Sequence, residues 1–408
     1  MKESILVIGS GYRNFREYAL RGLAQQYRVL LIGQSPLDWQ LPYAAEYREA
    51  DLKDEAAVFA AAEELAAENH VVGILTWEEM LITLASEAGT RLGVQTMPLE
   101  AARACRDKAR QRERFRAEGV PSARFHLAGT MAEAVAAAET IGYPVVVKPR
   151  GRAASVAVQI VRSEAELRAA FDFARSSENV SIADGLVLVE EFLVGEEISV
   201  DCWVLDGRVE PYVIALKRTD YPPFFEEVAH VAGKVLDSET EAAVRDVVIR
   251  ANNALGIDRT VTHTELMLTA DGPKVIEVNG RLGGELIPRL AEIAIPGLSI
   301  GDVLGAVATG REPAPIPEPD RLVGIRFLYP AADLTFDDIA VPATLADEPW
   351  VHEVRRVSEP GTELRLPPRQ FLGRAGYVIA TGADIAEIDA RLLALADKTT
   401  VMGEPLAA

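Results

Sequence analysis

The stretch Thr262-His-Thr-Glu-Leu-Met-Leu-Thr-Ala-Asp-Gly-Pro-Lys-Val-Ile-Glu-Val-Asn-Gly-Arg281 has two alternating apolar runs on either side of Ala270-Asp271-Gly272. A three-residue loop with glycine in the last position is typical of a β-hairpin closed by a type I turn and a bulge. Such a loop predicts that Thr269 pairs with Pro273. The stretch therefore predicts two adjacent antiparallel strands with a fixed register.

This register places polar side chains on one face of the hairpin. Counting outward from the loop pairs Glu265 with Glu277 and His263 with Asn279. Because side chains alternate between the two faces of a strand, these four share one face. The opposite face is expected to pack in the core, and its members are Leu266, Leu268, Ile276 and Val278.

Two glutamates directly opposite each other need a counter-charge. Their β-carbons lie about 5 Å apart, and two unit charges at that distance repel by about 3 kcal/mol at an effective dielectric constant of about 20. Mg²⁺ binds carboxylate and amide oxygens and keeps coordination positions for phosphate oxygens. We therefore predict that Glu265, Glu277 and Asn279 bind a metal. A solvated sheet face, on which the acids splay apart, is the alternative.

An arginine and two glycines follow the hairpin. Arg281 leads into Gly283-Gly284-Glu285 and then a predicted helix. Backbone N–H groups at the start of a helix can hold an anion, and an arginine beside them can neutralise a developing acyl phosphate. An ordinary loop arginine is the alternative.

Two lysines are candidate phosphate ligands. Lys148 ends the strand 145–149, and a lysine on a buried strand is unusual unless its ammonium has a partner. Lys108 lies on a charged helix that begins near residue 106 and ends at Gly119-Val120-Pro121, where a solvated surface lysine is the alternative. Glu190-Glu191 follow another buried strand, whose end offers backbone groups to a nucleotide base.

The first third of the chain alternates short strands with helices. Strands are expected at 5–8, 29–32 and 71–75 and a helix at about 54–68, which predicts a parallel sheet with crossover helices. Gly9-Ser10-Gly11 is interpreted as a tight strand-to-helix turn, because the third glycine and the ribose-binding acid of a dinucleotide site are missing.

The remaining elements are less regular. Trp77, Glu78 and Glu79 follow the strand 71–75, at the sheet edge where α/β folds bind ligands. Two antiparallel strands within 197–216 are expected to join at Asp206-Gly207. Further expected elements are strands at 156–161 and 186–189, helices at 130–141, 163–175 and 384–397, and a proline-rich linker at 313–319.

Bulk composition narrows the function classes. The chain has 408 residues, a net charge of −20 and two cysteines, Cys105 and Cys202. A nucleic-acid binder needs a basic footprint that this charge does not offer. No apolar run reaches the roughly 18 residues of a membrane helix. Two cysteines cannot build a disulfide framework, so we expect a cytoplasmic protein.

Five motifs resemble, in order and spacing, those of the ATP-grasp superfamily. They are Asp107-Lys108, Val145-Val-Val-Lys148-Pro149, Val189-Glu190-Glu-Phe-Leu-Val-Gly-Glu-Glu197, Glu265, and Glu277-Val-Asn279-Gly-Arg281. The resemblance implies a multidomain α/β and α+β fold. Its parts would be a pre-ATP-grasp parallel α/β domain (1–105), a small lobe with a phosphate flap (106–185), a large lobe with the Mg hairpin (186–312) and a C-terminal α+β part of the large lobe (313–408).

The resemblance also implies roles on the nucleotide side. Lys108 and Lys148 would contact the α- and β-phosphates of ATP. Ser155 lies in the flap 149–155, which holds one glycine here although many members are glycine-rich. The adenine and ribose contacts would come from Glu190, Glu191, Leu193 and Glu197.

On the metal and substrate side, Glu265, Glu277 and Asn279 would hold one or two Mg²⁺ ions, with Mn²⁺ as the alternative, and Arg281 would steady the acyl phosphate. The sequence looks most like the L-amino-acid ligases, in which a Glu-x-x-His pair lies near the substrate. Here that pair would be Glu227 and His230, against the alternative of a surface loop. The other substrate candidates are Glu78, His263, Gly283 and Gly284.

The function implied is an ATP-dependent carboxylate–amine ligase. It would join small-molecule, amino-acid-like substrates through an acyl phosphate and release ADP and phosphate. The alternatives are an ATP-grasp carboxylase or purine-pathway ligase with another acceptor, and a nucleotide-binding module without catalysis. Homodimers are common among similar enzymes, but the sequence leaves the oligomeric state open.

Overall fold

The computed structural model describes residues 2–152, 155–177 and 185–406. The N-terminal domain is built on a parallel sheet in the order β3-β2-β1-β4. Its strands are β1 (Ser4–Ile8), β2 (Arg28–Gly33), β3 (Ala44–Glu49) and β4 (Val71–Leu75), and its helices include α1 (Arg13–Gln26), α2 (Glu55–Glu68) and α3 (Ile82–Leu92). The sequence did not predict β3, because this half-exposed edge strand lacks an apolar run.

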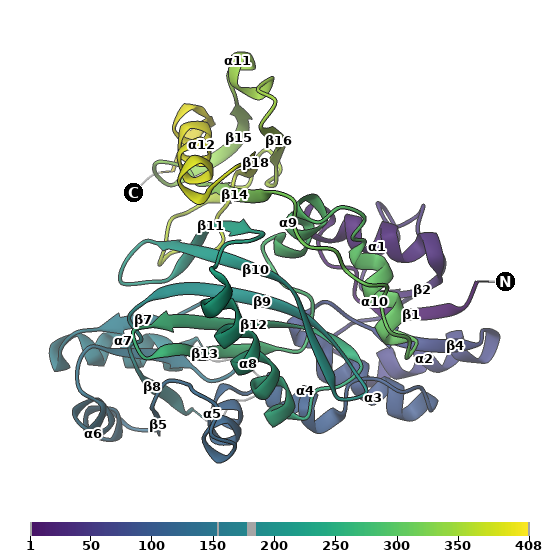
Figure 1. The fold of residues 1–408 in the computed structure, drawn as a ribbon, viewed down its shortest axis with the longest axis horizontal. Coiled ribbons are helices and arrows are strands. Elements are labelled where there is room, and N and C mark those ends of the chain that lie inside the picture. The colour runs from purple at the N-terminus through teal and green to yellow at the C-terminus, as the bar shows by residue number, and fades with distance from the viewer. Residues whose placement is uncertain (1, 153–154, 178–184, 407–408) are drawn as a thin grey trace.

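Helix α1 joins this domain to the large lobe. It packs against α10 (Ile300–Ala308), and the two helices lie side by side in Figure 1. The approach depends on glycine, since a Cβ added to Gly301 would lie 2.1 Å from the backbone nitrogen of Leu23. The carboxyl ends of β1 and β4 therefore have a fixed position against the large lobe.

The small lobe is a four-stranded antiparallel sheet in the order β5-β8-β6-β7. Its elements are β5 (Phe125–Ala128), β6 (Val145–Pro149), β7 (Gln159–Val161), β8 (Val187–Glu191), α6 (Met131–Ile141) and α7 (Glu164–Ser176). The expected strand 156–161 is shorter than predicted, because Ser155 and Ala157 adopt positive φ angles of 52° and 60° and end the extended conformation. Helices α4 (Leu99–Cys105) and α5 (Lys108–Ala117) precede this lobe.

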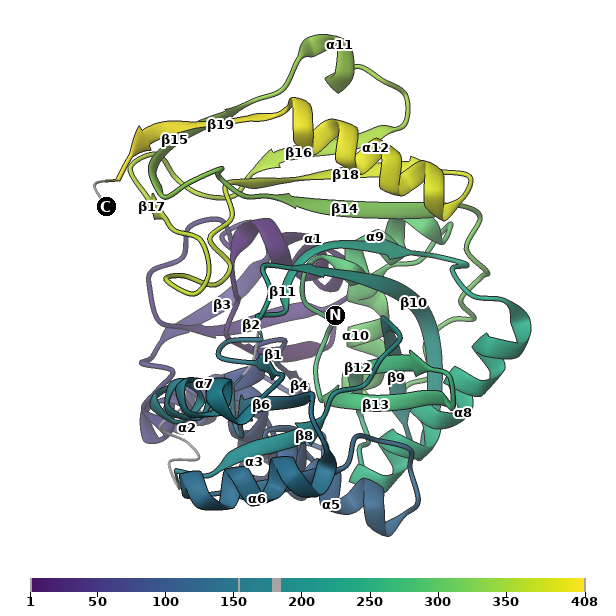
Figure 2. The same cartoon turned by 90° about the vertical axis from the view of Figure 1, so that its left-hand side faces the viewer.

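The large lobe is an eight-stranded sheet in the order β13-β12-β9-β10-β11-β14-β18-β16 (Figures 1 and 2). Its strands are β9 (Glu196–Leu205), β10 (Arg208–Asp220), β11 (Glu226–Ala232), β12 (Thr260–Thr269), β13 (Gly272–Asn279), β14 (Leu322–Leu328), β16 (Val351–Arg356) and β18 (Gly376–Gly382). Strands β9 and β10 join at Asp206-Gly207 as expected, with φ angles of 50° and 77°.

Helices and a small sheet complete this lobe. Helix α8 (Ser238–Leu255) contacts β10 and β13 on one face of the large sheet. The other elements are α9 (Ile287–Ala294), α11 (Ala343–Ala346), α12 (Ile385–Lys398) and the small sheet of β15 (Leu334–Ala340), β17 (Glu363–Leu364) and β19 (Thr400–Pro405). Among the described residues, none of the helices is both long and apolar enough to cross a membrane.

The hairpin β12–β13 confirms the predicted pairing of Glu265 with Glu277 and of His263 with Asn279. The predicted pairing at the loop is wrong: Thr269 faces Gly272, so the turn has two residues instead of three. A register shift beyond Glu265 absorbs the difference.

The shift also corrects one core assignment. Val275 is fully buried in the core, whereas Ile276 lines the same cavity as Glu277. A bulge places two successive side chains on one face of the strand. The sequence pattern alone could not show where this extra residue lies.

Candidate nucleotide and metal site

A cavity lies between the small-lobe sheet and the large-lobe sheet. Strands β6 and β8 and helix α5 form one side, and β9, β11 and the hairpin β12–β13 form the other. The expected site residues that line it are Lys108, Lys148, Ser155, Glu190, Glu191, Leu193, Glu197, Glu227, Glu265, Glu277, Asn279 and Arg281. The fold thus brings residues that are far apart in the sequence into one cavity.

The paired glutamates of the hairpin each contact a lysine. Lys108 Nζ lies 2.9 Å from Glu277 Oε1 and also donates to the backbone oxygen of Arg152 at 2.6 Å. Asp107 caps the N-terminus of α5 and so orients Lys108 at its first position. Asn279 is 3% exposed and faces the same cavity. Lys108 therefore offsets the charge of Glu277, and a second lysine offsets the charge of Glu265.

The second lysine, Lys217, forms the buried centre of a group that we call the Lys217 cluster: Lys217, Glu197, Glu227 and Glu265. Its Nζ lies 2.9 Å from Glu197, 3.0 Å from Glu227 and 3.3 Å from Glu265, and its side chain is 1% exposed. Burial disfavours the ammonium, but the three carboxylates outweigh this effect and raise the pKa of Lys217 well above its usual value.

His263 adds a second cation to this region. Its Nδ1 lies 2.5 Å from Asp201 Oδ1, and its Nε2 lies 3.6 Å from Glu265 Oε1. Although burial opposes protonation, Asp201 and Glu265 raise the pKa of His263 to about 9. Four carboxylates, those of the Lys217 cluster and Asp201, thus face the two cations Lys217 and His263.

This excess of negative charge and the oxygen donors fit a divalent cation. Over the described ranges no group of three His, Cys, Asp or Glu side chains is arranged as a metal site. The expected set differs from such a group, because it has two carboxylates, Glu265 and Glu277, and the amide of Asn279 as its third oxygen donor. Carboxylate and amide oxygens suit Mg²⁺ or Mn²⁺.

The small-lobe side of the cavity has a buried charge triad. Lys148 Nζ lies 2.5 Å from Glu190 Oε2, and Arg112 Nε lies 2.9 Å from Glu190 Oε1. Arg112 also donates to the backbone oxygen of Ile276 at 2.5 Å, which ties α5 to the hairpin. Burial and repulsion from Arg112 and Lys108 lower the pKa of Lys148, while Glu190 acts in the opposite direction.

Arg281 is held by an acid from the N-terminal domain. Its Nε lies 2.8 Å from Glu79 Oε2, and Arg106 Nη1 lies 2.9 Å from Glu79 Oε1. Burial raises the pKa of Glu79, but the nearby arginines outweigh this effect and lower it. Glu79, which the sequence suggested only as one of three neighbouring candidates, therefore positions the arginine of the cavity.

The other expected substrate residues lie outside this cavity. His230 is fully buried on β11, and its Nε2 lies 3.3 Å from Glu227 Oε2. Glu78 accepts a hydrogen bond from the backbone N–H of Gly11 at 3.0 Å. A Cβ added to Gly283 would lie 2.7 Å from Asp201 Oδ2, whereas one on Gly284 would meet open space.

The sequence did not identify Lys217, Arg112 or Asp201 as site residues. Lys217 gives the same signal as Lys148, since it follows the apolar run 213–216 on a strand. Arg112 lies among other arginines on α5, so its burial is not visible in the sequence. Asp201 interrupts an apolar strand, and that signal could have identified it.

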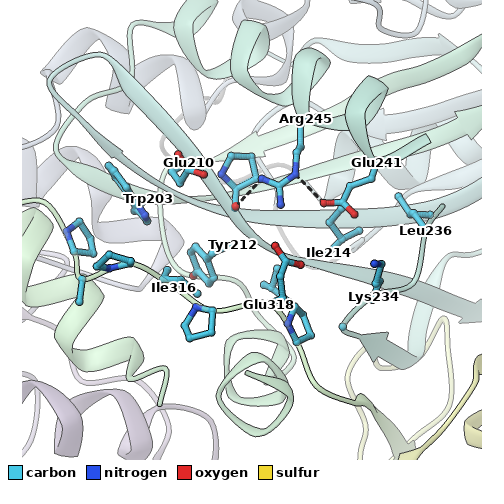
Figure 3. Close-up of a pocket in the computed structure, with 18 of the residues that line it drawn as sticks. Trp203, Glu210, Tyr212, Ile214, Lys234, Leu236, Glu241, Arg245, Ile316 and Glu318 are labelled. Atoms are coloured by element: carbon cyan, nitrogen blue, oxygen red, sulfur yellow. Dashed lines mark hydrogen bonds and ion pairs between the residues drawn. The ribbon is translucent and has the colours of Figure 1, made fainter. Parts of the chain in front are cut away.

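A larger hollow lies elsewhere, between β10 and the proline-rich segment 312–319 (Figure 3). The charges there are mixed, and Arg245 is bound to Glu241 at 2.8 Å and to the backbone oxygen of Pro211 at 3.0 Å. None of the expected site residues lines this hollow. We therefore place the chemistry in the cavity that contains the hairpin carboxylates.

Because His230 is buried, we expect the folded protein to lose stability in acid. Burial lowers the pKa of His230 to about 3 despite the nearby Glu227. Its unfolded pKa is about 6.5, so between these values the unfolded chain binds a proton that the folded chain does not. The free energy of unfolding should fall by about 1.4 kcal/mol per pH unit well below pH 6.5. Urea unfolding between pH 6.5 and 4.5 should therefore show about 2 kcal/mol more loss for the wild type than for His230→Gln.

Replacement of the exposed His126 by Gln is the matched control, and it should leave the wild-type pH dependence unchanged. Equal acid sensitivity of His230→Gln and the wild type would contradict a neutral, buried His230.

Comparisons with known proteins agree with this geometry. Residues 141–289 match the model of the ATP-grasp domain, and residues 326–402 match the L-amino acid ligase C-terminal domain 2. A phosphoribosylamine–glycine ligase of Streptomyces coelicolor is 31% identical over 410 residues, with 94% of this chain and 92% of the relative covered.

Two further likenesses concern ligases of amino acids. The alanine–anticapsin ligase of Bacillus subtilis is 29% identical over 266 residues, which are 60% of this chain and 55% of that relative. The chain thus spans about half the length of that relative. The crystal structure of an L-amino acid ligase from Bacillus licheniformis superposes with a TM-score of 0.83 at 24% identity, with 99% of this chain and 100% of that chain covered.

The phosphoribosylamine–glycine ligase likeness extends over nearly the whole of both chains, and the ATP-grasp match covers the hairpin and most of the cavity lining, but not Lys108, Arg112 and Ala123. The chain therefore belongs to the ATP-grasp ligases, and its last part is a C-terminal domain of the L-amino acid ligase type.

Proposed function

We propose that this chain is an ATP-dependent carboxylate–amine ligase that forms an amide or peptide bond between amino-acid-like substrates. One observation carries the proposal: the hairpin acids Glu265 and Glu277 face the same cavity as the lysines Lys108 and Lys148. Oxygen donors for a cation thus lie opposite cations for phosphate. The L-amino acid ligase type of the C-terminal domain supports amino acids as the substrate class.

The residues of the cavity divide into three proposed functions. Lys108 and Lys148 bind phosphate oxygens of ATP, and Ser155, the last residue of the expected flap 149–155, lines the same cavity. Residues 153–154 of that flap lie outside the described residues. Glu265, Glu277 and Asn279 hold one or two divalent ions. The base and ribose are bound by the strand-end segment that contains Glu190, Glu191, Leu193 and Glu197.

Catalysis then follows from positioning and charge neutralisation. A bound divalent ion supplies positive charge to the phosphate oxygens. A carboxylate oxygen of the donor attacks the γ-phosphorus in line, and ADP leaves. The amine attacks the carbonyl carbon of the acyl phosphate, the amide forms and phosphate leaves. Arg281 is placed to stabilise negative charge at the acyl phosphate. Glu227 lies beside the amino-acid substrate, and the buried His230 supports it from 3.3 Å away.

We expect the purified protein to release phosphate from ATP and Mg²⁺ only when amino acids are present. The first assay uses a pool of the twenty protein L-amino acids, with hydroxylamine to trap the activated carboxylate as a hydroxamate. Hydroxamate formation that requires both ATP and the pool supports the proposal. A screen of amino acid pairs then identifies the donor and the acceptor.

Two other outcomes would count against the proposal. ADP formation that requires bicarbonate and no amine would favour a carboxylase. Tight nucleotide binding without turnover in any amino acid mixture would favour a binding module. We also propose activity with Mn²⁺ in place of Mg²⁺, a homodimeric assembly, and a cytoplasmic setting that keeps the buried thiols Cys105 and Cys202 reduced.

A further inference from the structure

Arg16 lies in the first turn of α1, just beyond the turn Gly9-Ser10-Gly11 that ends β1. Its Nη1 donates to the backbone oxygen of Gly283 at 2.9 Å, so the side chain reaches across to the loop that follows the hairpin. Among the described residues, no Asp or Glu lies within ion-pair distance of Arg16. A half-buried guanidinium therefore has N–H groups that are not matched by a protein carboxylate.

A second arginine, Arg281, lies near Arg16. Burial and Arg281 lower the pKa of Arg16, whereas Tyr18 and Asp201 act in the opposite direction. Glu79 is shared between Arg281 and Arg106, at 2.8 Å and 2.9 Å. Arg281 thus adds positive charge near Arg16, and Glu79, the carboxylate paired with Arg281, is shared with Arg106. A planar guanidinium binds a carboxylate through two parallel hydrogen bonds, which gives both affinity and orientation.

Unsatisfied polar atoms lie beside Arg16. Trp77 is 1% exposed, and its indole N–H has no hydrogen-bond partner within the described part of the chain. A Cβ built on Gly11 would lie 2.9 Å from Arg16 Cγ and 3.4 Å from Trp77 Nε1, so these two side chains adjoin the same glycine. Asp201 Oδ2, beside Gly283, is also fully buried and unpartnered in that part. Buried polar groups normally have partners. A ligand carboxylate would accept a hydrogen bond from the Trp77 N–H, whereas Asp201 Oδ2 accepts only from a donor such as a ligand ammonium group.

We propose that Arg16 binds the free carboxylate of the amine substrate, so that the amine substrate is an amino acid. This inference rests on the proposed ligase function. Glu78, on the next loop of the same sheet edge, has no basic partner at ion-pair distance among the described residues and interacts electrostatically with Arg16. An α-amino acid carries both charges close together, and Arg16 and Glu78 are complementary to them.

The position of Arg16 favours the amine substrate over the activated one. The carboxylate that is phosphorylated must reach the γ-phosphate in the cavity of the hairpin. Arg281 lines that cavity and Arg16 does not. Arg16 is therefore placed for a carboxylate that remains unmodified throughout the reaction, which is the carboxylate of the acceptor.

The test compares two nucleophiles in the same enzyme. With the donor that gives the largest hydroxamate signal, hydroxylamine reports donor activation without any acceptor carboxylate. The second nucleophile is the acceptor amino acid found in the pair screen, together with its α-carboxamide. Arg16→Gln should raise the KM for the acceptor amino acid by about 10- to 100-fold, the effect of losing a charge-assisted pair. Hydroxamate formation should stay within about twofold of the wild type.

Two further variants separate binding from structure. Arg13→Gln removes an exposed arginine of the same helix, paired with Glu17 at 3.1 Å, and should change neither reaction. Arg16→Lys keeps the positive charge but cannot form two parallel hydrogen bonds with a carboxylate. It should therefore give an intermediate KM for the acceptor amino acid. The wild type should also use the carboxamide at least about 10-fold less well than the amino acid.

The inference fails if Arg16→Gln lowers hydroxamate and peptide formation equally, because Arg16 would then serve the donor or the fold. It also fails if the wild type uses the carboxamide as well as the amino acid. Absence of hydroxamate in the wild type, by contrast, overturns the proposed function and this inference with it.

Discussion

Glu277→Gln should lower the rate of ADP formation by at least about 10³-fold, equivalent to about 4 kcal/mol of transition-state stabilisation. The substitution keeps the shape of the side chain and removes its charge. Glu277 faces Glu265 across the hairpin and lies 2.9 Å from Lys108. Without this carboxylate, the proposed divalent ion loses one of its oxygen ligands. Lys108 also loses its ion pair with Glu277. Coupled-enzyme detection of ADP under saturating substrates measures the effect.

The fold should survive this change, because Lys108 keeps its hydrogen bond to the backbone oxygen of Arg152. Thermal unfolding of the variant in the absence of nucleotide checks this expectation. Glu196→Gln is the matched control, since Glu196 is an exposed carboxylate on a strand of the same sheet, 47% accessible and paired with Arg218. A Glu277→Gln protein that retains more than a tenth of the wild-type rate would contradict a metal role for the hairpin.

The register of this hairpin could be predicted because its information is local. Alternation of apolar and polar residues fixes which side chains share a face, and the pairing of Glu265 with Glu277 follows from counting. The turn itself was wrongly predicted, since a two-residue loop with a bulge and a three-residue loop give the same outer register. The faces of Val275 and Ile276 distinguish them, and an apolar side chain is compatible with either face.

The ion pairs of the site could not be predicted in the same way. Lys108 is 169 residues from Glu277 in the sequence, and Arg281 is 202 residues from Glu79. The packing of the lobes against each other determines these ion pairs, and no local sequence pattern predicts that packing. The resemblance to ATP-grasp enzymes supplied the expected ligands of the nucleotide. It did not supply the cations that neutralise those ligands, such as Lys217 and Arg112.

Lys217→Met should lower the free energy of unfolding by about 3–5 kcal/mol, the range found when one partner of a buried ion pair is removed. The substitution leaves Glu197, Glu227 and Glu265, which are 15–19% exposed, around a buried apolar side chain. Their mutual repulsion and the loss of solvation favour the unfolded chain. Urea unfolding at pH 7 measures the difference. Lys274→Met, on neighbouring β13 with 22% of its side chain exposed, is the control and should cost less than about 1 kcal/mol.

The pH dependence of this defect identifies its origin. Without Lys217, burial and mutual repulsion should raise the pKa values of Glu197 and Glu227 in the folded variant above their unfolded values, whereas His263 still lies beside Glu265. The folded variant then binds more protons than its unfolded chain, so the deficit relative to the wild type should shrink as the pH falls from 7 to 5. A cavity defect caused by the shape of Met would not change with pH. A deficit below about 1 kcal/mol, or one that is the same at both pH values, would show that Lys217 does not neutralise the cluster.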